Sequence, residues 1–321
     1  MGTTQAAFLG TVNDELGTAI HNLTWDEYRA VRRVNPSTIV YGMESRKHLL
    51  YAMTGPGMEP SNDMRLGTGI HALTLEPHTF KRDFAVIPPF HLDPENCTQN
   101  GKESKATTTS YCQGKIREFL EANPGKTVLT DEQYQRALKA VIALHANPRA
   151  SELVKTSIPE ITVTGVIEGI RFKGRIDLLQ TDTIGDIKTT VTADPWKFSV
   201  QFRNLRYAHK LSIYRELVRQ SLGRSLEVEI IAQEKKPPFD AVVFPVPADK
   251  LDEAFAEVCS TILDYRLAME TNHWPGRDKG ELTVSLLDIA FGGRAGQDDG
   301  AAYDWDADEV SDEDLASGDE L

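Results

Sequence analysis

The stretch EITVTGVIEGIRFKGRIDLLQTDTIGDIK, residues 160–188, decides the fold class of this chain of 321 residues. From Ile161 to Ile167, apolar and β-branched residues alternate with polar or small ones, which is typical of a half-buried strand. The pattern continues over residues 170–179 and 184–188, which a tight turn at 181–183 joins. The stretch therefore predicts a β-meander of three strands.

The segments around this meander predict a mixed α/β architecture. A long amphipathic helix over residues 195–221 follows it, then strands over 227–233 and 241–246 and a last helix over 251–269. Caps and proline breaks predict the earlier elements, which are helices over 24–34, 36–53, 63–76, 113–122 and 130–146 and a strand over 84–89. This order predicts one mixed central sheet flanked by helices, preceded by a helical N-terminal lobe.

Composition divides the chain into five segments. They are an N-terminal extension (1–23), a helical N-terminal part carrying His71 (24–90), a flexible polar arm (91–113), an α/β core (114–275) and a C-terminal region with a disordered acidic tail (276–321). The arm is assigned because it is rich in Asn, Thr, Ser, Lys and Gly and contains almost no large aliphatic side chains.

Charge is distributed unevenly along the chain, whose formal net charge is −13. Residues 298–321 contain eleven acidic side chains and no Lys or Arg, so this tail carries most of the negative charge. Between residues 171 and 236, thirteen Lys or Arg face eight Asp or Glu, a local excess of five positive charges. The net charge therefore does not exclude nucleic acid as a ligand of the core.

Several protein classes are disfavoured by what the sequence lacks. No apolar run reaches the roughly 18 residues that a membrane span needs. Residues 1–10 lack the basic start and apolar stretch of a signal peptide. The three scattered cysteines fit neither a disulfide framework nor a zinc or iron–sulfur site. We therefore expect a cytoplasmic protein without a membrane partner.

Asp177 and Asp186 are the first candidates for chemistry. Asp177 falls near the end of one predicted strand and Asp186 begins the next, so a hairpin can bring two mutually repelling carboxylates side by side. Hard oxygen ligands, with water and a phosphate oxygen, are what Mg²⁺ and Mn²⁺ prefer. Lys188, two residues after Asp186, shares its strand face and can orient an attacking water or stabilise transition-state charge. The carbonyl of Ile187 can supply another ligand.

His71 and Glu160 are further candidates for the same site. His71 follows Gly67 and Gly69 in a predicted helix, where each glycine costs roughly 1 kcal/mol relative to alanine. Such glycines often mark a close approach of the backbone to a ligand or to another element. A lone helical histidine is more often packed or on the surface, and a carboxylate at a strand edge is often only solvated. Residue types alone leave these alternatives open.

The order of these motifs resembles a known family. His71, Glu160, GRID (174–177), GDIKTT (185–190) and then a helix ending at Tyr214 are similar to the RecB-like branch of the PD-(D/E)XK nucleases. Within that branch, the likeness to phage-encoded exonucleases of the exodeoxyribonuclease VIII (RecE) type rests on residues 25–28 (WDEY), 35–38 (NPST), 66–73 (LGTGIHAL), 75–77 (LEP) and Phe80. The resemblance covers residues 24–269.

The resemblance implies a restriction-endonuclease-like core and a role for each matching residue. Metal binding is implied for His71, Asp177 and Asp186, with Glu160 as a further ligand of the metal or of water and Lys188 as the catalytic lysine. The family helix usually carries Gln-x-x-x-Tyr, and the matching pair in this chain is Lys210 and Tyr214. Lysine keeps a donor for phosphate but changes its charge and geometry.

Basic and aromatic residues on and near that helix suit phosphate binding. The predicted DNA-binding residues are Arg175, Lys197, Arg203, Arg206, Tyr207, Lys210 and Tyr214. On an isolated helix such residues would more simply form a solvated polar face. The neighbouring carboxylate–lysine site favours contact with DNA.

The implied function is a Mg²⁺-dependent exodeoxyribonuclease, with Mn²⁺ as an alternative ion. It would resect linear double-stranded DNA from its ends, 5′ to 3′, to give single strands for recombination. The resemblance also implies a homo-oligomer, a RecT-like single-strand annealing partner, and the cytoplasm of a bacterium or a phage-infected host cell. Two alternatives remain: an endonuclease or nickase of the same fold, and a catalytically inactive module that binds DNA ends.

Overall fold

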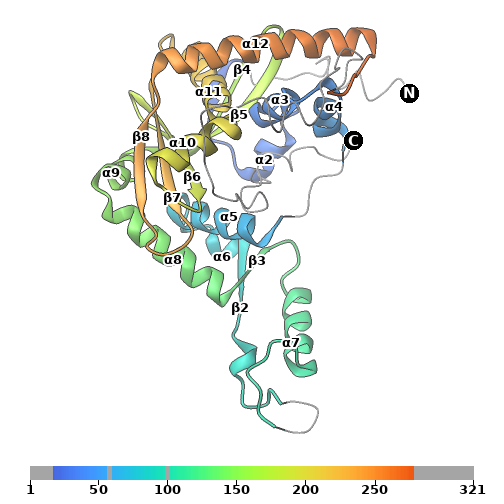
Figure 1. Cartoon of the computed structure of the whole chain (residues 1–321), viewed down its shortest axis with the longest axis vertical. Coiled ribbons are helices and arrows are strands. Elements are labelled where there is room, and N and C mark those ends of the chain that lie inside the picture. The colour runs from blue at the N-terminus through green and yellow to red at the C-terminus, as the bar shows by residue number, and fades with distance from the viewer. Residues whose placement is uncertain (1–16, 56–59, 98–101, 278–321) are drawn as a thin grey trace, which may run out of the picture.

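The computed structural model describes residues 17–55, 60–97 and 102–277, which form a rounded body with a narrow arm (Figure 1). A mixed sheet of six strands lies at the centre of the body, in the order β1-β4-β5-β6-β7-β8. Its strands are β1 (Ala19–His21), β4 (Ile158–Ile167), β5 (Ile170–Leu179), β6 (Thr183–Thr190), β7 (Glu227–Glu234) and β8 (Ala241–Pro245). The predicted fold class, an α/β core with a mixed central sheet, is confirmed.

The predicted meander is the antiparallel run β4-β5-β6. Strand β7 pairs with β6 in parallel, because the chain between them crosses the sheet through α10 (Pro195–Asn204) and α11 (Tyr207–Leu222). Strand β8 then returns antiparallel to β7. Because the neighbouring strands β6 and β7 run parallel, the carboxyl end of the meander lies beside the carboxyl end of β7.

Helices cover both faces of the sheet (Figure 1). One core cluster contains residues of α11 and the sheet together with residues of α3 (Pro36–Gly42), α4 (Arg46–Thr54) and α12 (Ala248–Thr271). A second cluster joins the sheet to α5 (Asn62–Leu75), α8 (Asp131–Ala146) and α9 (Pro148–Thr156). Within the described residues, every helix is either too short or too polar to cross a membrane.

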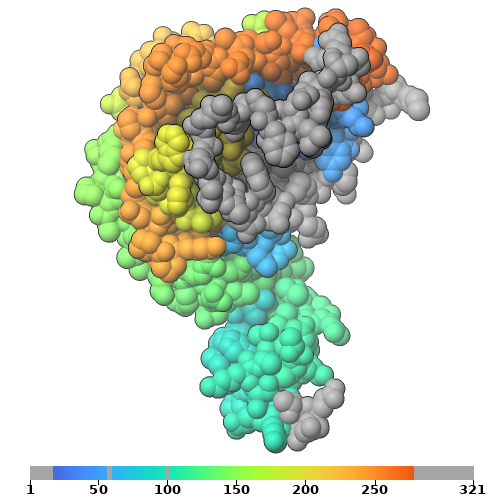
Figure 2. Space-filling view, viewed as in Figure 1, coloured from blue at the N-terminus to red at the C-terminus, as the bar shows by residue number. Residues whose placement is uncertain are grey.

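The arm leaves the body after α6 (Phe80–Asp83) and stands clear of it (Figure 2). Its elements are β2 (Phe84–Ile87), the 3-10 turn η1 (Phe90–Leu92), α7 (Ser110–Glu121) and β3 (Thr127–Thr130), and β2 pairs with β3 in parallel. The buried Asn96 side chain donates to the carbonyls of His91, Ser104 and Ala106, at 3.1, 2.6 and 3.2 Å. The described part of the predicted arm is therefore organised around one amide.

The prediction of two continuous helices is wrong, because each is divided into two in the structure. The helix expected over 195–221 is divided into α10 and α11, because Arg206 adopts a left-handed backbone conformation with φ of 54°. The helix expected over 36–53 is divided into α3 and α4, where the Ser45 side chain caps α4 by accepting from the amide of His48.

Several described elements, among them β1, β3 and α9, had no prediction, and two predicted segments fall partly outside the structure. The short strands β1 and β3 are defined by pairing with distant partners. Helix α9 begins after Asn147, whose side chain accepts from the amides of Arg149 and Ala150. Most of the predicted extension (1–23) and of the predicted C-terminal region (276–321) lies outside the described residues.

The glycines of α5 allow this helix to lie close to two strands. A Cβ on Gly67 would lie 2.9 Å from Thr189 Oγ1 of β6, and a Cβ on Gly69 would lie 2.9 Å from Leu129 Cδ1 of β3. Close approach to other elements, one of the predicted reasons for these glycines, is therefore what the structure shows. The approach of α5 to β6 also fixes the distance from His71, one helical turn after Gly67, to the sheet.

We expect Gly67→Ala to destabilise the protein by about 1–3 kcal/mol, because the added methyl group overpacks the contact with Thr189. The matched control is Gly114→Ala in α7, where an added Cβ has no neighbour within 4 Å. That substitution should stabilise the protein by about 1 kcal/mol through helix propensity alone. Urea unfolding of both variants measures the difference, and equal shifts would contradict the close approach of α5.

Candidate functional site

Three carboxylates stand at neighbouring positions across β4, β5 and β6. The β4–β5 register omits the position at which Glu160 faces Asp177. The β5–β6 pairing covers two positions and ends just before Asp177 would pair with Asp186. The backbone ladders are interrupted at these positions, and the Asp177 carboxylate accepts from the Ile187 amide of β6 instead. The sheet thus gathers three like charges at one point.

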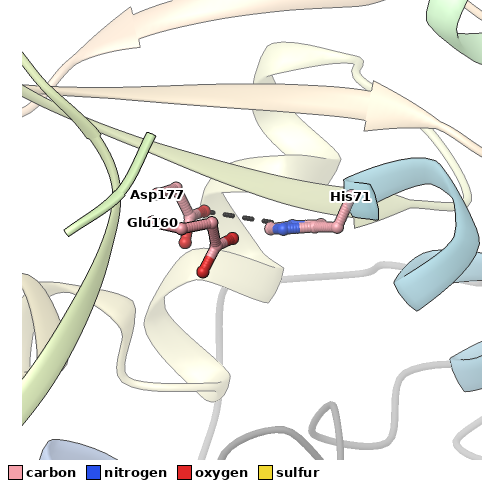
Figure 3. A group of neighbouring side chains, drawn as sticks. All are labelled: His71, Glu160 and Asp177. Carbon is pink, nitrogen blue, oxygen red and sulfur yellow. Dashed lines mark ion pairs between the residues drawn. The ribbon is translucent and has the colours of Figure 1, made fainter. Parts of the chain in front are cut away.

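His71 of α5 completes a cluster with two of these carboxylates. One ligand atom each from His71, Glu160 and Asp177 lies within 4.8 Å of the others, and Figure 3 shows the imidazole and the two carboxylates pointing toward one another. His71 Nε2 lies 3.9 Å from Asp177 Oδ2. The helix from one side and the two strands from the other therefore converge on one small volume.

The peptide groups of Ile187 join the cluster to β6. The backbone amide of Ile187 donates to Asp177 Oδ2 at 2.7 Å, and its carbonyl oxygen lies 2.8 Å from His71 Nε2. With Nε2 protonated, the imidazole donates to that carbonyl. Both contacts tie the cluster to β6, and they place the Ile187 carbonyl beside the imidazole of His71.

Asp186 and Lys188 form an ion pair on the same strand. Lys188 Nζ donates to Asp186 Oδ1 at 3.1 Å and lies 2.9 Å from Oδ2, which has no hydrogen bond of acceptable geometry. The ammonium group also lies 5.3 Å from the centre of the Tyr207 ring. Burial raises the pKa of Asp186 and the nearby Asp177 adds to this rise, while Lys188 and Lys210 oppose it.

These donors have the chemistry of a divalent metal site. One imidazole nitrogen, carboxylate oxygens and a backbone carbonyl suit Mg²⁺ or Mn²⁺ better than a thiolate-preferring metal. The buried Asp186 Oδ2, next to Asp177, is the kind of oxygen that a cation would satisfy. Asp186 is not in the group of three within 4.8 Å that the described residues contain. Its carboxylate faces Lys188 instead, so of the two predicted aspartate ligands, only Asp177 lies in the cluster.

A cavity of about 380 Å³ opens over this cluster. Among the predicted DNA-binding residues, those that line it are Arg175, Arg206, Tyr207, Lys210 and Tyr214. The other two, Lys197 and Arg203, are exposed on α10 and are not among its lining residues. Lys210 Nζ lies 5.6 Å from the centre of the Tyr214 ring, so the pair that matches the family helix motif is in contact.

Tyr214 also explains the glycine of the GRID motif. A Cβ on Gly174 would lie 2.6 Å from Tyr214 Cε1, so only glycine lets β5 pass under the ring. Arg175, the next residue, binds Glu160 with Nε 2.5 Å from Oε2. The motif therefore connects the α11 helix, the carboxylate cluster and β5 within four residues.

Several residues that line the cavity were given no role from the sequence, among them Glu44, Gln201 and Lys235. Glu44 accepts from Arg206 at 3.0 Å across a separation of 162 residues. Lys235 Nζ lies 3.1 Å from Asp63 Oδ2 across 172 residues. Because these partners are so distant in sequence, no local pattern could mark them. The buried Gln201 accepts from Thr190 Oγ1 at 2.6 Å and thereby ties α10 to the end of β6.

Comparison with known protein families finds one whose model matches this chain. A family model described as a PDDEXK-like domain of unknown function (DUF3799) matches residues 37–283, more than three quarters of the chain. This match supports the PD-(D/E)XK superfamily, to which the sequence motifs were likened. No curated protein is significantly similar in sequence.

A solved structure shares the fold. A presumed exonuclease from Eubacterium rectale superposes with a TM-score of 0.55 at 15% identity, over 85% of this chain and 99% of its own. At that identity the likeness shows the fold alone. A second structure, SSO0001, is 12% identical over 62% of this chain and 84% of its own, and its TM-score of 0.25 is too low to support an argument.

The raised pKa of Asp186 makes a prediction for the metal-free protein. An acid whose pKa is higher in the folded than in the unfolded state stabilises the fold when it is protonated. This contribution is complete below the unfolded-state pKa and is lost as the pH rises through the folded-state pKa. We therefore expect Asp186→Asn to stabilise the protein at neutral pH, with a gain that shrinks as the pH falls toward about 3.9.

Urea unfolding in the presence of a chelator, repeated across this pH range, measures the gain. Asp182→Asn is the matched control, because Asp182 is exposed in the turn between β5 and β6. Its stability difference from the wild type should stay small at each pH. A gain for Asp186→Asn that does not vary with pH would contradict the assignment of the raised pKa to this carboxyl group.

Proposed function

This chain belongs to the PDDEXK-like family DUF3799, and from that premise we propose that it is a metal-dependent exodeoxyribonuclease acting on the ends of linear double-stranded DNA. The observation that carries the proposal is the cluster of His71, Glu160 and Asp177, with the Asp186–Lys188 pair on the next strand, under a cavity lined by basic residues. Such a site combines ligands for a divalent cation with groups that bind a phosphodiester.

The proposed metal ligands are His71, Asp177, Asp186, Glu160 and the carbonyl of Ile187. When bound, a Mg²⁺ or Mn²⁺ ion supplies an activated water and neutralises charge on the scissile phosphate. Asp177 enters this role already oriented, because its Oδ2 accepts from the Ile187 amide. Asp186 pairs with Lys188 in the absence of metal, and its buried Oδ2 is the oxygen that we assign to the ion.

Lys188 is the proposed catalytic lysine. Its ammonium group is held between Asp186 and the Tyr207 ring. From there it can orient the attacking water and stabilise the charge that develops on the phosphate oxygens. The contacts with Asp186 and Tyr207 hold the ammonium group in place before substrate arrives.

DNA contacts follow from the walls of the cavity. Four of the predicted DNA-binding residues line the cavity from the N-terminal half of α11 and its N-cap. They are Arg206, Tyr207, Lys210 and Tyr214. We assign them to the phosphates next to the scissile one, and Lys197 and Arg203, exposed on α10, to DNA farther from the reacting bond.

The finer parts of the proposal rest on the RecE-type resemblance of the sequence motifs. They are digestion from 5′ to 3′, single strands delivered to recombination, a homo-oligomeric assembly, a RecT-like annealing partner, and a cytoplasmic location in a bacterium or phage-infected cell. Mg²⁺ is the proposed ion, with Mn²⁺ as the alternative.

The proposal predicts digestion of linear duplex DNA labelled at its 5′ or 3′ end, only when Mg²⁺ or Mn²⁺ is added. Asp186→Ala should abolish this digestion without unfolding the chain, because it removes a ligand from the metal site. Asp182→Ala, in the exposed β5–β6 turn, is the matched control and should digest at the wild-type rate. Full activity of Asp186→Ala would refute the assigned site.

The same assay separates the alternatives. Cleavage of a closed circle would favour an endonuclease or nickase of this fold. Binding of DNA ends without any product, with all ligands intact and metal present, would favour an inactive end-binding module. The end label that is lost first reports the direction of digestion.

Lys210 makes a further prediction, because the family motif has glutamine at this position. We expect Lys210→Gln to retain DNA cleavage while the slope of log binding constant against log salt becomes smaller by about one. Lys210→Met, which leaves no hydrogen-bond donor, should also lower the cleavage rate. Binding is measured with Ca²⁺ in place of Mg²⁺ to prevent cleavage. The control is Lys250→Gln, at an exposed position of α12. If Lys210→Gln and the wild type gave equal slopes, Lys210 would not be a DNA contact.

A further inference from the structure

We propose that Arg175 is a positioning residue, which holds Glu160 in the metal cluster, and that helix α2 (Trp25–Ala30) holds Arg175 for this purpose. The inference rests on the proposed function in one respect, namely that His71, Glu160 and Asp177 bind a divalent ion. It differs from the sequence-based prediction that Arg175 contacts DNA.

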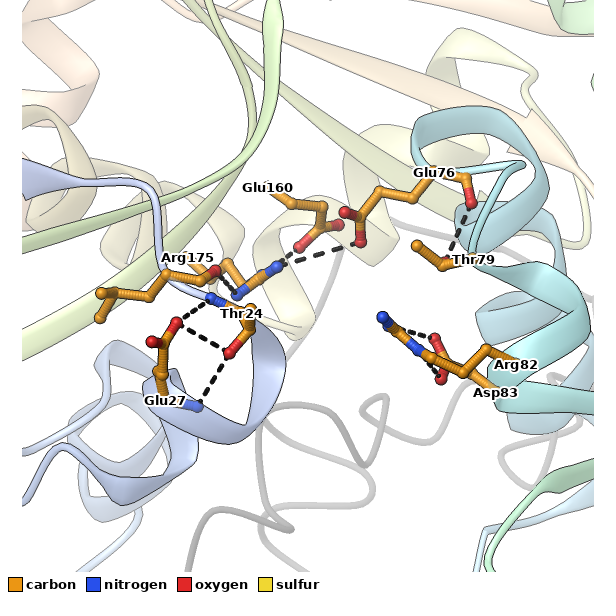
Figure 4. Close-up of polar contacts among 9 residues, drawn as sticks. Thr24, Glu27, Glu76, Thr79, Arg82, Asp83, Glu160 and Arg175 are labelled. Carbon is orange, nitrogen blue, oxygen red and sulfur yellow. Dashed lines mark hydrogen bonds and ion pairs between the residues drawn. The ribbon is translucent and has the colours of Figure 1, made fainter.

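The guanidinium group of Arg175 is committed to protein partners. Nε donates to Glu160 Oε2 at 2.5 Å, Nη1 donates to the carbonyl of Leu23 at 3.2 Å, and Nη2 lies 3.9 Å from Glu76 Oε2. Its side chain is only 10% exposed. Figure 4 shows the group between Glu160 on one side and the start of α2 on the other. A phosphate would have to displace these partners to reach it.

Helix α2 supports the guanidinium through two aromatic rings. The centres of the Trp25 and Tyr28 rings lie 5.4 and 5.7 Å from Arg175 Cζ, and the two rings stack on each other with centres 5.5 Å apart. The planar guanidinium can also stack against aromatic faces, which the compact ammonium group of a lysine cannot do. The rings therefore fix the plane in which Nε points at Glu160.

The position of α2 is itself fixed by its cap. Thr24 and Glu27 form a capping box, in which Glu27 Oε2 accepts from the Thr24 amide at 2.8 Å and Thr24 Oγ1 accepts from the Glu27 amide at 3.3 Å (Figure 4). Farther along the helix, Tyr28 Oη donates to Oδ1 of the buried Asn35 at 3.0 Å. The helix is thus tied at both sides of the rings that support Arg175.

The backbone of Glu160 explains why such support is needed. Its φ of 53° lies in the left-handed region, which is unfavourable for a side chain bearing a Cβ, and it interrupts the β4–β5 ladder. Strained residues of this kind persist where surrounding contacts hold them, often at functional sites. Here the strain turns the Glu160 carboxylate toward Asp177, and the charge of Arg175 offsets the repulsion between the two carboxylates.

The experiment measures Mn²⁺ binding by calorimetry on the full chain without DNA. Arg175→Met keeps the apolar bulk beside the rings but removes the charge, and it should weaken Mn²⁺ binding by about 10- to 100-fold. Arg175→Lys should restore part of the loss, because it keeps the charge but cannot stack on the rings as a guanidinium does. Arg149→Met is the matched control, since Arg149 also binds a glutamate of the sheet, Glu229 at 2.9 Å, away from the cavity.

A double-mutant cycle with Glu160→Gln tests whether Arg175 acts through Glu160. In the Glu160→Gln background, Arg175→Met should cause no further loss of Mn²⁺ affinity. Independent, multiplying losses would overturn the proposal. It would also be overturned if Arg175→Met bound Mn²⁺ as the wild type does but bound duplex DNA more weakly in a chelator, with the salt slope reduced by about one, because Arg175 would then contact phosphate.

Two further results distinguish a failure of this inference from a folding defect or from a failure of the proposed function. If Arg175→Met does not fold by circular dichroism, Arg175→Lys and Trp25→Leu carry the test, and both must weaken Mn²⁺ binding in a folded chain. If the wild-type chain takes up no Mn²⁺, the proposed metal-dependent function fails. If the wild type binds Mn²⁺ and the Arg175 variants bind it equally well, only the role of Arg175 fails.

Discussion

Three carboxylates held on neighbouring strands repel one another, and much of the site is built to contain this repulsion. Each of them has its own partner: Glu160 binds Arg175, Asp177 accepts from the Ile187 amide, and Asp186 binds Lys188. A divalent cation held by His71, Glu160 and Asp177 would offset the same repulsion. The partners keep the acidic side chains in place without replacing the metal.

The geometry of the cluster depends on close packing more than on any one bond. Helix α5 can bring His71 to β6 only because Gly67 presents no side chain to Thr189, and β5 can pass under Tyr214 only because Gly174 does the same. Left-handed backbone at Glu160 and at Arg206 adds two local strains beside the cavity. The surrounding core has to stabilise these features, which fits their position at a candidate active site.

The basic excess of the core is only partly directed at a ligand. Arg175 faces Glu160, Arg206 faces Glu44, and Lys235 faces Asp63, so several cations near the cavity are already paired with carboxylates from other elements. Such pairs orient long side chains and lower the entropy lost when they meet a phosphate. The electrostatic field over the cavity thus depends on how charges from distant segments are placed, which a count of charges along the chain does not reveal.

The sequence by itself determined the strands of the meander, the pairing of Asp186 with Lys188 on one strand, and the nearness of Asp177, because period-two alternation and short turns are local properties. It also indicated that α5 approaches another element, through its two glycines. Only the tertiary structure decided which donors meet: His71 reaches Ile187 across 116 residues, Glu160 takes its orientation from a broken ladder and from Arg175, and α10 separates from α11 at Arg206. These contacts depend on how helices pack on the sheet, and packing joins residues whose separation in sequence carries no periodic signal.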